Sequence, residues 1–98
     1  MADTIAARVA RGAALLDERI PGWDQRIDLD TLDIDSCQNC VLSQLFGSPQ
    51  NAFDFNPYYG FDIEDYNPRS RLSSIRRAQR LTAQWRRVIG ARRAGGES

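Results

Sequence analysis

Apolar residues recur at helical spacing in three stretches of the chain, and the segments between these stretches have no regular period. The first stretch places one set of apolar side chains on a single helix face: Ile5, Val9, Ala13, Leu16 and Ile20. We expect Asp3 to cap this helix, which should run to about Arg19 before Pro21. Gly12 lies inside the pattern at a cost of roughly 1 kcal/mol relative to alanine, so it predicts close approach by another backbone.

The second predicted helix is shorter and begins beside the two cysteines. Ser36, or Asp35 before it, is a suitable N-cap for a helix over about residues 37–46, and Gly47 favours a stop there. Upstream, residues 27–35 alternate loosely between apolar residues and aspartate. This pattern fits a short strand or an extended loop, and we expect the aspartates to cap short helical turns instead.

The third predicted helix is apolar on one side and basic on the other. Asn67 followed by Pro68 is a suitable opening, Ser70 is a second choice of cap, and the helix should run to residues 90–93. Its apolar stripe consists of Leu72, Ile75, Ala78, Leu81 or Thr82, Trp85, Val88 and Ile89. Its other side carries Arg76, Arg77, Arg80, Gln84 and Arg87.

Aromatic residues gather between the second and third helices, in residues 51–67. Six of the nine aromatic residues of the chain lie there: Phe53, Phe55, Tyr58, Tyr59, Phe61 and Tyr66. We expect an ordered loop that packs its phenylalanines onto the helices, because a structureless loop of this length is uncommon in a compact domain. The sequence thus predicts a mainly α domain of three helices over residues 1–93, with residues 94–98 as a flexible tail.

Charged residues are distributed unevenly along the chain. The chain has 98 residues with 42% hydrophobic residues, which is enough for one small core. It has no apolar run long enough to span a membrane and no secretory signal pattern, so we expect a cytoplasmic protein. Its net charge of zero is split between a net −8 in residues 1–66 and a net +8 in residues 67–98. The sequence therefore predicts an acidic body and a basic last helix.

The spacing of Cys37 and Cys40 admits three interpretations. A C-x-x-C at a helix N-terminus is used by redox dithiols and as half of a zinc site. However, Asp33 and Asp35 nearby disfavour a thiolate, and the chain offers no histidine or third cysteine, so zinc would need aspartates or a dimer. In the third interpretation, which we favour, both thiols pack as small hydrophobic groups and the protein carries no cofactor.

Two surfaces are candidates for partner binding. The tyrosines of the aromatic segment, Tyr58, Tyr59 and Tyr66, lie among acids and could form contacts of the kind enriched at protein interfaces. The second surface consists of Arg76, Arg80 and Arg87. These arginines could contact phosphates, pair with the protein's own aspartates, remain solvated, or bind another protein. The chain lacks histidine and lysine, and no acid stands out, so we expect no enzyme activity.

Several segments together resemble a group of small hypothetical proteins encoded by actinobacterial phages. The likeness rests on residues 8–17, Pro21-Gly22-Trp23, residues 27–34, Cys37-x-x-Cys40-Val-Leu-x-Gln-Leu-Phe-Gly47, Tyr59-Gly60-Phe61 and residues 81–86. It implies a phage accessory protein in the host cytoplasm and supplies no catalytic or ligand residues. We therefore expect a non-enzymatic protein that binds another protein, with a host protein as one candidate. Nucleic-acid binding by the third helix is the alternative, and a metal or redox role is a weaker one.

Overall fold

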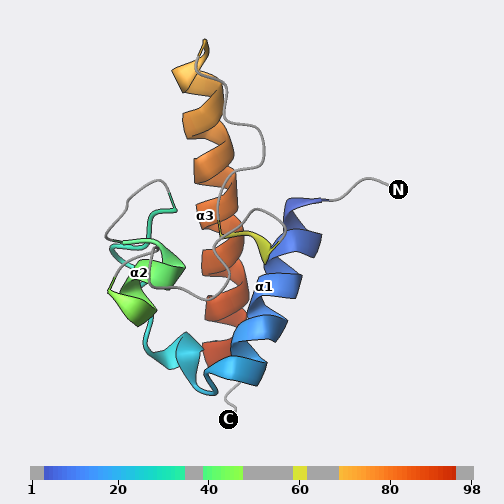
Figure 1. The fold of residues 1–98 in the computed structure, drawn as a ribbon, viewed down its shortest axis with the longest axis vertical. Helices are drawn as coiled ribbons and strands as arrows, with labels where there is room; N and C mark the ends of the chain where they lie inside the picture. The colour runs from blue at the N-terminus through green and yellow to red at the C-terminus, as the bar shows by residue number, and fades with distance from the viewer. Residues whose placement is uncertain (1–3, 35–38, 48–58, 62–68, 95–98) are drawn as a thin grey trace.

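A computed structural model of the chain describes residues 4–34, 39–47, 59–61 and 69–94. Within these residues the elements are α1 (Ile5–Arg19), the short 3₁₀ helix η1 (Trp23–Gln25), α2 (Val41–Phe46) and α3 (Arg71–Ala94), and no strand is present among them. The predicted mainly helical architecture with three α-helices is therefore confirmed (Figure 1). No helix in this part of the chain is long and apolar enough to cross a bilayer.

Helix α3 is the axis around which the other elements are arranged (Figure 1). Its 24 residues correspond to a length of about 36 Å, most of the 43 Å longest dimension of the molecule. Helix α1 runs in the same direction beside the C-terminal part of α3, and α2 lies on the other side of α3 in this view. The N-terminal part of α3 consequently extends beyond both shorter helices.

Side chains other than those expected cap the helices. Thr4, not Asp3, caps α1, because its hydroxyl accepts a hydrogen bond from the amide of Ala7 at 3.0 Å. Ser70, the second choice, caps α3 by accepting from the amide of Ser73 at 3.3 Å. The predicted opening of α3 at Asn67-Pro68 is wrong, since residues 69 and 70 still lie outside the helix. Each hydroxyl stands three residues before the amide that it satisfies.

The start of α2 also differs from the prediction. The helix begins at Val41 because Cys40 is its N-cap, with an extended backbone (φ −72°, ψ 168°) that cannot belong to a helix. The sulfur of Cys40 accepts a hydrogen bond from the amide of Ser43 at 3.4 Å. The predicted start at residue 37 with a Ser36 or Asp35 cap is therefore wrong. The predicted end is confirmed, because Gly47 closes the helix in the left-handed region at φ 85°.

The segment between α1 and α2 forms turns that α3 holds in place. In the Asp28–Asp30 turn, the carboxylate of Asp28 accepts from the amide of Asp30 at 3.0 Å. The buried amide of Ile34 donates to the hydroxyl of Thr82 at 3.0 Å, and the guanidinium of Arg86 donates to the carbonyl of Leu32 at 3.2 Å. Our expectation that aspartates cap turns in this segment is confirmed at Asp28.

Tryptophan 85 occupies the centre of the core. Its side chain is 0% exposed, as predicted, and its ring stacks on Phe61 at a centroid distance of 5.5 Å. The Trp23 ring meets it edge to face at 5.7 Å. The Trp85 indole N–H donates to the carbonyl of Gly60 at 2.6 Å. These contacts join η1, α3 and residues 59–61 in a single core.

Another backbone segment approaches α1 closely at Gly12. A Cβ atom placed on Gly12 would lie 2.0 Å from the carbonyl oxygen of Tyr59 and 3.0 Å from the ring of Trp85. The close approach predicted from this glycine is confirmed.

The apolar stripe of α3 is buried only where neighbouring elements cover it. Ala78, Leu81, Thr82, Trp85 and Ile89 are buried as predicted. The first two members of the predicted stripe are not, because Leu72 is 59% exposed and Ile75 is 37% exposed. Both precede the part of α3 that lies beside α1 (Figure 1).

Candidate functional site

Six of the eight arginines of α3 fall into two sets with different surroundings. The first set, Arg86, Arg92 and Arg93, contacts the protein itself. Arg93 donates to the carbonyl oxygen of Asp24 at 2.9 and 2.7 Å and to that of Ile27. Arg86 donates to a carbonyl of the same acidic segment, as described above. These guanidiniums satisfy main-chain oxygens of turns that have no regular hydrogen-bonding partner.

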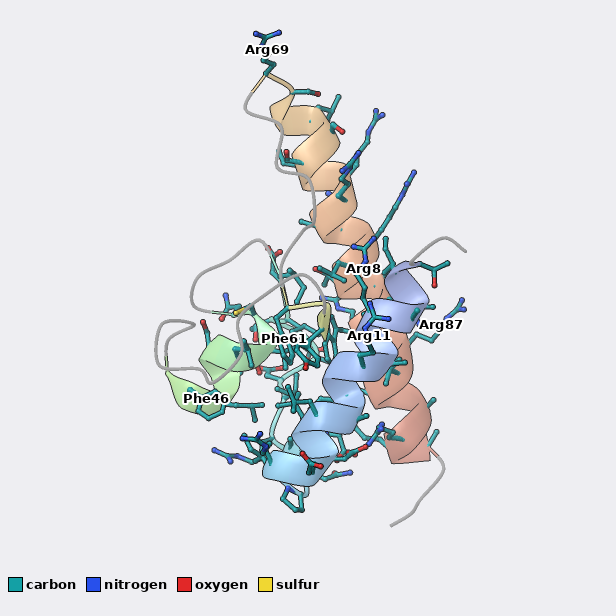
Figure 2. The ribbon with its side chains drawn as sticks, turned by 45° about the vertical axis from the view of Figure 1, so that its right-hand side comes forward. Arg8, Arg11, Phe46, Phe61, Arg69 and Arg87 are labelled. Carbon is teal, nitrogen blue, oxygen red and sulfur yellow. The ribbon has the colours of Figure 1, made fainter. Side chains whose placement is uncertain are left out.

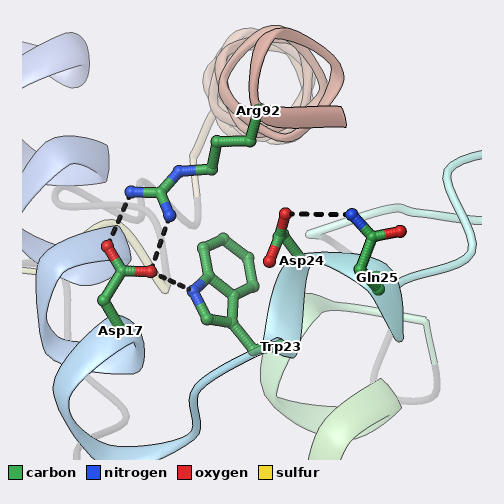
Figure 3. Close-up of polar contacts among 5 residues, drawn as sticks. All are labelled: Asp17, Trp23, Asp24, Gln25 and Arg92. Carbon is green, nitrogen blue, oxygen red and sulfur yellow. Dashed lines mark hydrogen bonds and ion pairs between the residues drawn. The ribbon is translucent and has the colours of Figure 1, made fainter. Parts of the chain in front are cut away.

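Arg92 forms the strongest ion pair of this set (Figure 3). Its guanidinium donates to both carboxylate oxygens of Asp17, at 2.6 and 2.7 Å. The Trp23 indole N–H also donates to Asp17, at 2.9 Å, and the Arg92 guanidinium lies 5.5 Å from the centre of the Trp23 ring. The hydrogen bond from Arg92 lowers the pKa of Asp17 and, in return, raises the pKa of Arg92. The side chains of Arg86, Arg92 and Arg93 are thus occupied by contacts within the protein.

The second set, Arg76, Arg80 and Arg87, is exposed. None of the three forms a hydrogen bond or an ion pair through its side chain within the described part of the chain. At about 100° per residue, the three positions fall within about 40° of one another, on the side of the helix opposite Trp85. They extend over about 16 Å of the helix axis, and Arg87 points away from the body of the protein (Figure 2).

Two further residues complete this surface. Leu72 and Ala83 are also exposed and lie in the same sector of α3. We call Leu72, Arg76, Arg80, Ala83 and Arg87 the outward face of α3. No acidic residue occurs between Arg71 and Ala94, so no neighbouring carboxylate on the helix neutralises this face. A shallow hollow of about 290 Å³ lies along its N-terminal end, lined by Ser70, Leu72, Ser73, Arg76, Arg77 and Arg80.

The predicted aromatic surface is represented by Tyr59 alone in the described residues. Its ring is half-buried, lies against the core and is 6.3 Å from the ring of Phe61, which is buried as expected. Tyr58 and Tyr66, together with Phe53 and Phe55, lie outside the described residues. Of the three predicted tyrosines, the described residues thus place Tyr59 alone, and its ring packs against the core.

Cys40 has a structural part in this fold. It is buried, and its thiol donates to the hydroxyl of Ser43 at 3.2 Å while its sulfur caps α2. Cys37 lies outside the described residues. Among the residues that the structure describes, no group of three or more histidine, cysteine, aspartate or glutamate residues could hold a metal ion.

The division of the arginines into two sets is a feature that the sequence analysis missed. The signal was present in the helical positions, because Arg86 and Arg93 lie close to the buried sector of α3 whereas Arg76, Arg80 and Arg87 lie opposite it. Leu72 gave the same signal, because its helical position falls in the sector of Arg76, whereas the exposed Ile75 gave none, since its spacing continues the buried stripe. Comparison of the chain with protein-family models, with curated protein sequences and with solved structures finds no match.

Proposed function

We propose that this protein is a non-enzymatic binding protein that engages an acidic surface of another protein through the outward face of α3. The observation that carries the proposal is the separation of the arginines into two sets. Arg76, Arg80 and Arg87 are exposed and do not pair with the acids of the body, although Asp17 and the turns of residues 24–32 hold Arg86, Arg92 and Arg93 of the same helix. Their charges are therefore available to a partner.

The apolar end of this face supports a protein as the partner. Leu72, at 59% exposure, lies beside Arg76 in the same hollow, and Ile75 is exposed one turn further along the helix. Arginine is enriched in protein interfaces, where burial of an adjacent apolar side chain adds to the binding energy. This end of α3 extends beyond α1 and α2 (Figure 1). The resemblance to phage proteins makes a host protein the first partner to seek.

A second candidate function is binding of duplex nucleic acid by the same helix. The observation that favours it is the straight row of arginines on a helix without any acidic residue. A row of about 16 Å is long enough to contact several phosphates, which follow one another at about 3.4 Å along each strand axis. Phosphate contacts of this kind would not require Leu72.

Charge reversal and removal of the leucine separate the two candidates. Immobilised wild-type protein, Arg80→Glu and Leu72→Ser are used for capture from host extract, and each is also titrated with a fluorescent duplex at low salt. Arg26→Glu is the matched control, because Arg26 is exposed and its side chain has no partner among the described residues. Thermal melts verify that all variants fold.

A protein partner predicts that Arg80→Glu and Leu72→Ser each lower the amount of the captured protein by about tenfold, while Arg26→Glu leaves it unchanged. A purified partner should reproduce these differences. Duplex binding that falls steeply with salt and is lost in Arg80→Glu, but not in Leu72→Ser, would replace the first candidate by the second. Capture that is the same for Arg80→Glu and Arg26→Glu would contradict both.

A further inference from the structure

An acidic turn lies beside the outward face of α3. Asp28 and Asp30 are exposed, and neither forms an ion pair within the part of the chain that the structure describes. The carboxylate of Asp28 contacts the turn's own backbone, whereas that of Asp30 points to no described donor. Neither carboxylate is therefore in an ion pair with an arginine of the described part of the molecule.

The turn and α3 together line a hollow of about 450 Å³. Residues 30–33 stand on one side of this hollow, and Gln79, Thr82, Ala83 and Arg86 of α3 stand on the other. The guanidinium of Arg86 is engaged by the carbonyl of Leu32. Ala83 belongs to the outward face, so the acidic turn and the row of arginines border each other on one surface. Arg80 has no partner on that surface, because its position on the helix turns it away from the hollow.

We propose that a second copy of this chain docks on this surface, with the outward face of one copy against the acidic turn of the other. In a two-fold arrangement with antiparallel α3 helices, Arg80 of each copy would meet Asp30 of its partner, so that the same contact forms twice. Opposite charges that stand side by side on one surface, each without an internal partner, are what such a self-complementary interface requires. The exposed Leu72 would be covered at the edge of the same contact.

This inference goes beyond the proposed function and does not depend on it. Because both use the outward face, self-association would compete with the binding of another partner. The protein would then present its arginines only after the pair of chains separates.

Sedimentation velocity on the purified protein tests the inference directly. The wild type should form dimers at about 50 mM NaCl and protein concentrations up to about 500 μM, where a dissociation constant near 100 μM still gives mostly dimer. At about 500 mM NaCl the dimer should dissociate, since salt screens the attraction between Arg80 of one copy and Asp30 of the other. Arg80→Glu alone and Asp30→Arg alone should each raise the dissociation constant by about tenfold or more. Arg26→Glu should not.

The decisive experiment exchanges the charges at positions 80 and 30. An equimolar mixture of the Arg80→Glu and Asp30→Arg variants restores opposite charges at both contacts, and the chain that carries both substitutions does so with itself. Both samples should regain the dimer, while each single variant remains mostly monomeric at the same concentration. A wild type that is monomeric at low salt overturns the inference, and so does a dimer that the single reversals leave unchanged. If the outward face still binds another macromolecule in that case, the proposed function stands and only the second copy is excluded.

Discussion

Replacing Gly12 by alanine should destabilise the protein, although alanine is the better helix former. The gain in helix propensity is roughly 1 kcal/mol. Against it, the new Cβ would lie 2.0 Å from the carbonyl oxygen of Tyr59, far inside any permitted contact, and 3.0 Å from the Trp85 ring. Since a backbone atom stands in the way, α1 and residues 59–61 must move apart.

The cost of that movement follows from the contacts it disturbs. Separation of the two segments would strain the hydrogen bond from the Trp85 indole to the carbonyl of Gly60 and the stacking of Phe61 on Trp85. Overpacking typically costs about 1–3 kcal/mol, and loss of a buried hydrogen bond costs a similar amount. We therefore expect Gly12→Ala to lower the free energy of unfolding by about 2–4 kcal/mol net of the propensity gain.

Gly90 provides the matched control in α3. A Cβ at Gly90 would meet nothing within 4 Å, so the same substitution should stabilise the protein by about 0.5–1 kcal/mol through helix propensity alone. Urea unfolding followed by circular dichroism at 222 nm measures both changes. The reasoning is refuted if the two alanines stabilise the protein equally, because residues 59–61 would then not lie against α1.

Three further substitutions test other parts of the fold. Thr82→Val should cost about 1–3 kcal/mol because it leaves the buried amide of Ile34 without an acceptor, and Thr82→Ser should restore most of the loss in urea unfolding. The pKa of Asp17 is lowered below its usual 3.8 by the hydrogen bond from Arg92, so the pair stabilises the fold above about pH 4, and this stability is lost as the pH falls through the lowered pKa. Asp17→Asn should accordingly flatten the decline of Tm between about pH 5 and 2, and an unchanged decline would exclude this role. Leu72→Ser should change the free energy of unfolding by no more than about 0.5 kcal/mol, whereas a large loss would place Leu72 in the core.

Much of the fold was accessible from the sequence because local signals agree with it. The 3.6-residue spacing of apolar positions located α1 and most of α3, and the glycine at position 47 located the end of α2. Gly12 also indicated a tertiary contact, since a glycine inside an amphipathic helix lowers helix stability and is usually explained by close packing. These features depend on periodicity and on backbone geometry, which neighbouring residues determine.

The remaining features depend on which elements meet in space. Several polar residues near each helix start are suitable caps, so the sequence alone did not single out the residues that cap the helices in the structure, which are Thr4, Cys40 and Ser70. The exposure of Ile75 could not be predicted, because its spacing matches the buried stripe and it precedes the part of α3 that lies beside α1 (Figure 1). Leu72 could have been recognised as exposed, because it falls in the same sector of the helix as Arg76. Arg76, Arg80 and Arg87 were identified from the sequence on the polar side of the helix, and they are exposed there. Of the tyrosines predicted as a second surface, only Tyr59 is among the described residues.

The central claim is that the outward face of α3 is where this protein meets another one. Photo-crosslinking with benzoylphenylalanine at position 83 tests it most directly, with position 14 as the control, because both positions are exposed alanines on helices and only Ala83 lies on the outward face. In actinobacterial cells that express the protein, the account predicts an adduct with a different protein from position 83 and none from position 14. Equal adducts from the two positions, or no adduct with another protein from position 83, would contradict it.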